Sequence, residues 1–155
     1  MDVKIVNPFI NATVKVLGTM AHAKVNPGKP YVKNDNIAKG DVTGIIGITG
    51  ETNGTISVTF DAGSILKVMS SMFGEEVTTL GAEVSDAVGE LTNMISGQAR
   101  RKLGEMGKVF DAAIPSVVTG KNHRITHITN GPIVAIPFTT EGGSFTIEIC
   151  FENQV

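Results

Sequence analysis

The spacing of apolar residues divides the chain into helical and extended segments. Residues 80–107 carry apolar side chains three and four positions apart, which predicts one long helix. Residues 42–49 and 54–60 are rich in Ile, Val and Thr, a composition typical of the two strands of a β-hairpin. A short helix is expected next, with Asp61 as its N-cap and Gly74 at its end.

The N-terminal part is predicted to form a helix followed by a loop. Asn7 precedes Pro8. Because asparagine caps helices well and proline fits the first helical position, we expect the helix to start there. Residues 24–37 contain two prolines and many polar residues, which predicts a loop leading into a weak strand at a sheet edge.

The last third of the chain is predicted to be mostly extended. Residues 110–118 indicate a strand, residues 124–128 a further short strand, and a final hairpin pairs 133–138 with 145–151. The order helix, strands, hairpin therefore occurs twice, which indicates a duplicated half-domain. We expect a single α+β domain over residues 1–155, with one continuous antiparallel sheet and the long helices packed on one face.

Composition and charge narrow the classes of function. The apolar fraction of 41% and the charged fraction of 18% are those of a folded globular protein. A net charge of −2 gives no electrostatic attraction to nucleic acid or to an anionic membrane. No apolar run approaches the roughly 20 residues of a membrane span. Cys150 is the only cysteine, so no disulfide forms within the chain, and a reducing cytoplasm is the expected location.

The long helix separates its apolar residues from a small polar set. A stripe that must face the sheet contains Val84, Ala87, Val88, Leu91, Met94 and Ile95. On a different face, Glu90 and Asn93 stand three positions apart, so their side chains are neighbours. A glycine inside a helix destabilises it by about 0.5–1 kcal/mol relative to alanine, but it leaves the backbone uncovered by a side chain. We expect a partner protein to contact Asp86, Gly89 and Gly97. In isolation, such a Glu/Asn pair is ordinarily no more than a solvated surface.

The surrounding residues give the pair a context. The run Gly89-Glu-Leu-Thr-Asn-Met94, preceded by Asp86 and followed by Gly97, resembles the signature helix of the CheC/CheX/FliY family of phospho-CheY phosphatases. Residues 46–50 and 115–120 resemble the CheX branch in order and spacing. The resemblance extends over nearly the whole chain.

This resemblance implies an enzyme that removes phosphate from the aspartyl phosphate of a CheY-like receiver domain in chemotaxis or a related two-component pathway. Asn93 would hold the attacking water, and Glu90 would pair with a lysine of the receiver. The receiver would supply Mg²⁺, so this chain is expected to bind no metal or cofactor of its own. The resemblance also implies a homodimer joined through sheet edges.

Other candidate sites are weaker. The glycines from Gly44 to Gly54 imitate a phosphate-binding loop, but they lie in a hairpin and lack the Gly-Lys-Ser/Thr ending, which favours a structural role. Cys150 alternates with apolar residues and is expected to be a buried, inert thiol. The histidines lack partners at metal-ligand spacing: His22, His123 and His127.

Two functions other than phosphatase activity fit the same residues. A non-catalytic adaptor would keep this fold and bind a response regulator, a flagellar switch component or a CheD-type deamidase. A structural domain would use its sheet edges for assembly alone.

If the domain is duplicated, the first helix corresponds to the long one. Aligning Asn11 with Asn93 puts Pro8 where Glu90 stands, so no second active pair is expected.

Overall fold

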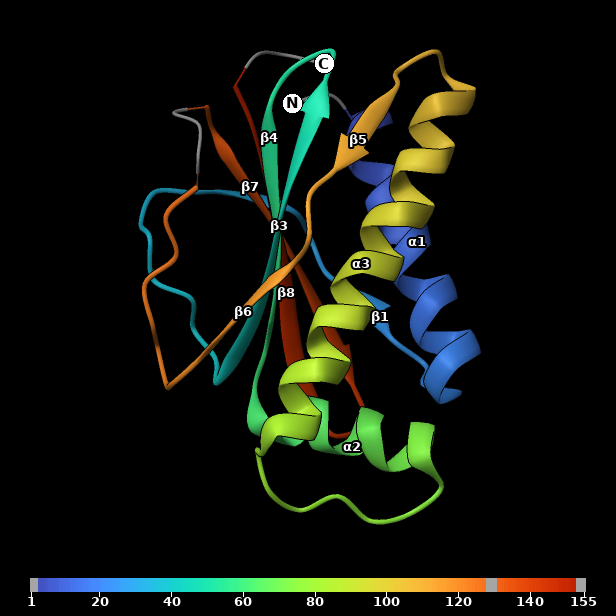
Figure 1. Cartoon of the computed structure of the whole chain (residues 1–155), viewed down its shortest axis with the longest axis vertical. Coiled ribbons are helices and arrows are strands. Elements are labelled where there is room, and N and C mark those ends of the chain that lie inside the picture. The colour runs from blue at the N-terminus through green and yellow to red at the C-terminus, as the bar shows by residue number, and fades with distance from the viewer. Residues whose placement is uncertain (1–2, 128–130, 153–155) are drawn as a thin grey trace.

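The computed structural model describes residues 3–127 and 131–152, which form an α+β domain (Figure 1). The helices in these ranges are α1 (Val3–Ala21), α2 (Ala62–Phe73) and α3 (Ala82–Glu105). The strands are β1 (Asn26–Pro27), β2 (Tyr31–Lys33), β3 (Val42–Gly50), β4 (Gly54–Phe60), β5 (Phe110–Ala112), β6 (Ser116–Thr119), β7 (Ile133–Thr140) and β8 (Gly143–Phe151). Among the described residues, no helix is long and apolar enough to cross a membrane.

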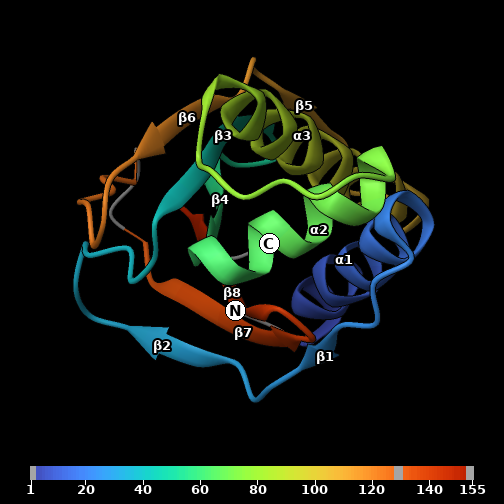
Figure 2. The same cartoon turned by 90° about the horizontal axis from the view of Figure 1, so that it is seen from below.

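The strands form one continuous antiparallel sheet, as predicted. Its order is β1-β7-β8-β4-β3-β5, with β2 also paired to β7 and β6 to β3. The predicted hairpins are β3–β4 and β7–β8, and the pairing of β4 with β8 joins them at the centre. Helices α1 and α3 lie beside each other against one face, and α2 closes one end of this layer (Figures 1 and 2).

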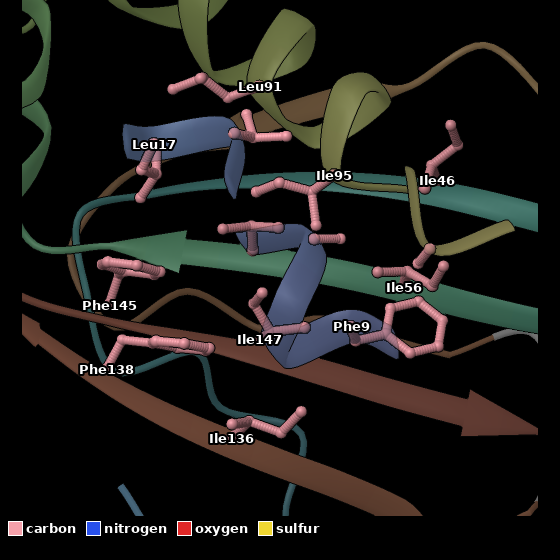
Figure 3. Close-up of a cluster of buried hydrophobic side chains, with 14 of the residues drawn as sticks. Phe9, Leu17, Ile46, Ile56, Leu91, Ile95, Ile136, Phe138, Phe145 and Ile147 are labelled. Carbon is pink, nitrogen blue, oxygen red and sulfur yellow. The ribbon is translucent and has the colours of Figure 1, made fainter. Parts of the chain in front are cut away.

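The core lies between this face of the sheet and the helices. Leu91 and Ile95 project from α3, and Phe9 projects from α1, towards Ile46 and Ile56 of the central strands (Figure 3). All five side chains are fully shielded from solvent. Full burial of each such side chain stabilises the fold by roughly 1.5–3 kcal/mol, so the predicted apolar stripe fixes which face of α3 turns inward.

The pairing of the short strands supports the predicted duplication. β1 and β2 of the first half pair with β7 of the second, and β5 and β6 of the second half pair with β3 of the first. Each short pair is interrupted in the same way. The amide of Gly28 donates to the Pro137 carbonyl at 2.7 Å, and the amide of Ala113 donates to the Gly47 carbonyl at 2.9 Å. The two halves therefore share one backbone plan.

The predicted start of the first helix is wrong. α1 begins at Val3, and Pro8 lies inside it. The residues before Pro8 are not a cap, because Ile5 and Val6 are buried in the core together with Phe9. Packing of this apolar face holds the preceding turn in the helix, although proline has no amide hydrogen to donate.

The predicted strands of the last third need two corrections. The strand expected over 110–118 is two strands, β5 and β6, with a break at residues 113–115. The strand expected over 124–128 does not form within 124–127, where one isolated bridge joins Arg124 to Ile37, and residue 128 lies outside the described residues. Apolar composition alone does not make a strand where no continuous neighbour is available to accept its hydrogen bonds.

The edge strand expected within 24–37 is confirmed by β2.

The opposite face of the sheet carries a buried charged group. Glu148 of β8 is 2% exposed. Its carboxylate accepts a hydrogen bond from Lys33 Nζ at 2.7 Å and contacts His127 Nε2 at 3.1 Å. These contacts join β8 to Lys33 of β2 and to the segment that contains His127. Burial raises the pKa of Glu148, but the hydrogen bonds from His127 and Lys33 and the positive charge of Lys33 outweigh burial and hold the pKa below its usual value.

We expect the fold to lose stability in acid through this group. Because the pKa of Glu148 is lower in the folded chain than the ordinary value of 4.5, the ionised carboxylate stabilises the fold above that pH. This stabilisation declines as the pH falls below about 4.5 and through the folded-state pKa. Denaturant unfolding of wild type and Glu148→Gln across this range measures it. The variant is expected to show a flatter dependence on pH, and parallel curves would contradict the assignment.

Candidate active site

The polar residues predicted on α3 share one exposed face. Asp86, Glu90 and Asn93 are exposed, whereas Leu91 and Thr92 between the last two are buried. The alternation follows from the 3.6-residue turn, because the apolar stripe points at the sheet and the polar residues point away from it. The structure thus brings the Glu90 and Asn93 side chains out together, as the sequence predicts.

A close approach of α3 to β3 sets the distance of the helix, and so of its exposed face, from the sheet. A Cβ atom at Gly44 of β3 would lie 2.9 Å from Thr92 Cβ, closer still to Thr92 Oγ1, and 3.2 Å from Val88 Cγ1. Glycine is therefore required for the helix to reach the sheet here. The Thr92 hydroxyl donates to the Val88 carbonyl at 2.7 Å and needs no other partner. The sequence indicated a structural role for Gly44, but only the packing connects it with the pair on α3.

The two glycines expected to receive a partner have different surroundings. A Cβ atom at Gly89 would touch Val117 Cγ2 of β6 at 3.4 Å, so this glycine lies along the contact between helix and strand. At Gly97 the nearest atom would be Arg100 Nη2 at 3.7 Å, which belongs to a flexible side chain of the same helix. Gly89 therefore packs against another element of the domain, whereas Gly97 contacts only its own helix.

The Glu90 carboxylate and the Asn93 amide have no side-chain partner among the described residues. Neither group makes a hydrogen bond or an ion pair with them. They also contain no cluster of three His, Cys, Asp or Glu residues able to hold a metal ion. The arrangement therefore consists of one carboxylate and one amide on a rigid helix. Such a pair can orient a water molecule through the amide and meet a cation through the carboxylate.

Comparing α1 with α3 in the structure aligns their residues differently from the prediction. Thr13 and Thr92 are both fully buried, each donates to the carbonyl four residues earlier at 2.7 Å, and each lies ten residues after the start of its helix. Matching them places Asn11 opposite Glu90 and the half-exposed Val14 opposite Asn93. The alignment of Asn11 with Asn93 is thus replaced, and α1 still lacks the pair.

Comparison with known proteins shows the family of the chain. The family model described as "Chemotaxis phosphatase CheX" matches residues 42–139, which include β3, β4 and α3. The chain belongs to the CheX family of chemotaxis phosphatases. It is 31% identical to the CheY-P phosphatase CheX of Thermotoga maritima over 140 residues, which cover 90% of this chain and 89% of the relative.

Solved structures of CheX-like proteins share the whole fold. A CheC-like superfamily protein from Shewanella sp. PV-4 is 47% identical, with a TM-score of 0.93 over 99% of this chain and 100% of that one. A chain of the CheX–CheY–BeF₃–Mg²⁺ complex from Borrelia burgdorferi is 26% identical, with a TM-score of 0.81 over 96% of this chain and 97% of that one. The predicted CheX-type fold and the predicted class of enzyme, a phosphatase, are confirmed.

Proposed function

We propose that this CheX-family chain hydrolyses the aspartyl phosphate of a CheY-like receiver domain, with Glu90 and Asn93 as the residues that enter the receiver site. The observation that carries the proposal is the unpaired, exposed Glu/Asn pair on a helix held firmly against the sheet at Gly44. The naming of the Thermotoga relative as a CheY-P phosphatase and the Borrelia complex of CheX with CheY support the choice of substrate.

Asn93 is proposed to position the attacking water. Its amide carries both a donor and an acceptor and is uncharged at any pH, so it orients water without acting as a strong base. The water oxygen forms a bond to phosphorus as the bond between phosphorus and the aspartyl oxygen breaks. The receiver recovers its carboxylate, and inorganic phosphate leaves as H₂PO₄⁻ with the oxygen and both protons of the water. Alignment of water and phosphorus is the main contribution that such a reaction needs from the protein.

Glu90 is proposed to pair with a lysine of the receiver. Its carboxylate is exposed and stands one turn before Asn93, so an ion pair there would fix the register in which the amide approaches the phosphate. The divalent metal of the reaction is proposed to belong to the receiver. The chemistry of the pair supports this, because one carboxylate and one amide are too few ligands to hold Mg²⁺ without help.

The direct test measures loss of phosphate from a CheY receiver of the same organism, phosphorylated with acetyl phosphate, with and without this protein. We expect catalytic acceleration that saturates with receiver. Binding without acceleration would contradict the proposal and favour the adaptor.

For Glu90→Gln we expect a raised KM for the receiver and a lowered kcat. The change removes the charge but keeps the shape, so the ion pair is lost and the water is held in a looser register. The matched control is Glu83→Gln, which alters another exposed carboxylate in the first turn of the same helix and is expected to leave both constants unchanged. Constants for Glu90→Gln equal to those of wild type would mean that Glu90 is only a solvated residue.

A further inference from the structure

The break between β5 and β6 is a β-bulge that exposes one apolar side chain. β3 residues Ile48 and Ile45 pair with Ala112 and Ser116, so two residues of β3 face three residues, 113–115, of the neighbouring chain. The extra residue turns Ile114 outward. Its exposed fraction of 89% is the highest of the large apolar side chains in the described ranges. Bulges beside active sites often redirect a side chain in this way.

The bulge stands next to the helix that carries the pair. Val117 of β6 faces Gly89, with 3.4 Å between Val117 Cγ2 and the position of a Cβ at Gly89. From β6 back to β5, the chain runs in the same direction as α3 (Figure 1). Val117 and Ile114 are three residues apart, which is at most roughly 10 Å in an extended chain. Asn93 lies about one turn beyond Gly89 and Gly97 about two turns, or roughly 6 and 12 Å along the helix. These rises put the bulge alongside the part of α3 that contains Asn93 and Gly97.

The bulge is anchored on both sides, so the exposed side chain is held in place. The Ala113 amide donates to the Gly47 carbonyl at 2.9 Å, and Pro115 restricts the backbone before β6 begins. A side chain presented by such a fixed backbone loses little conformational freedom on binding, which favours its use as a contact for another protein.

The duplicated half provides an internal comparison. Residues 28–30 form the corresponding bulge between β1 and β2, with the Gly28 amide donating to the Pro137 carbonyl at 2.7 Å and a proline before the second strand. Lys29 stands there in the place of Ile114, and it is exposed. The bulge is thus a feature of the fold, whereas its apolar tip is found only in the half whose helix has the Glu/Asn pair.

We propose that Ile114 is a docking contact for the receiver domain, an apolar anchor beside α3 that determines how tightly the substrate protein binds. This inference rests on the proposed function. The occupant is an apolar patch on the receiver surface next to its phosphorylation site, because β6, which follows the bulge, contacts α3 at Gly89, the residue before Glu90. Ile114 sets affinity, whereas Asn93 sets the rate of hydrolysis.

The experiment is saturation kinetics with the acetyl-phosphate-treated CheY receiver. Ile114→Ala is expected to raise KM about tenfold, which corresponds to losing part of the burial of one aliphatic side chain, with kcat unchanged. Lys29→Ala, at the tip of the duplicated bulge, is the matched control and is expected to leave KM and kcat unchanged. Thermal unfolding should be the same for wild type and both variants, because both side chains are exposed.

The outcomes separate this inference from the proposed function. No acceleration by the wild type would remove the proposed function itself. Acceleration by the wild type with the same KM for Ile114→Ala would overturn the docking role alone, and so would equal effects of Ile114→Ala and Lys29→Ala. The molecular mass in solution is measured without receiver as well. A lower mass for Ile114→Asp than for wild type would assign Ile114 to contact between copies of this chain and would also overturn the proposal.

Discussion

Replacing Asn93 with alanine is expected to slow hydrolysis of the phosphorylated receiver by roughly 100-fold or more, the usual effect of removing one positioning contact from a transition state. The fold should be unaffected. Asn93 is exposed and has no side-chain hydrogen bond among the described residues, so we expect the free energy of unfolding to change by less than about 0.5 kcal/mol. The substituted helix keeps Glu90, and docking should persist.

Two measurements check this expectation. Binding of the variant to the receiver with BeF₃⁻ and Mg²⁺ in place of the phosphoryl group should match wild type, while kcat falls. Asn11→Ala is the matched control, since it removes an exposed asparagine from α1 and is expected to leave kcat unchanged. Hydrolysis by Asn93→Ala within a few-fold of wild type would refute the proposed role. Residual activity that disappears only when Asn11 is also replaced would reveal a second site on α1.

Replacing Gly44 with alanine is expected to impair catalysis without touching the exposed face. The new methyl group would overlap Thr92, which lies between Glu90 and Asn93 along α3. The helix must then rise from the sheet or tilt. Overpacking of this kind typically costs about 1–3 kcal/mol of stability. A displacement of the pair by about 1 Å can lower the rate by on the order of 100-fold. We therefore expect a large loss of kcat, measured well below the unfolding temperature of the variant.

A rescue and a control distinguish displacement of the helix from simple loss of stability. Thr92→Ala in the Gly44→Ala background removes the closest clashing atom, Oγ1, and should restore part of the rate. Gly104→Ala is the control, because a Cβ atom there would meet nothing within 4 Å. That substitution is expected to be neutral or slightly stabilising. Full activity and stability of Gly44→Ala would show that the helix does not depend on this glycine.

The accuracy of the sequence-based expectations depended on how local their physical basis was. The N-cap at Asp61 is confirmed, since its carboxylate accepts from the Ser64 amide at 2.7 Å, and Gly74 ends the helix in the left-handed conformation. Those interactions involve neighbours in the sequence. Pro8 misled because its local preference for a first helical position was weaker than the burial of Ile5 and Phe9 by distant parts of the chain.

The sequence by itself determined the long helix, its buried stripe and the exposure of Glu90 beside Asn93. Helical periodicity places these residues whatever the helix rests on. Only the tertiary structure decided the rest. The packing of α3 on Gly44 and the bulge that turns Ile114 outward both arise between segments far apart in the chain. Such contacts depend on strand register and on the distance between helix and sheet, and one sequence states neither.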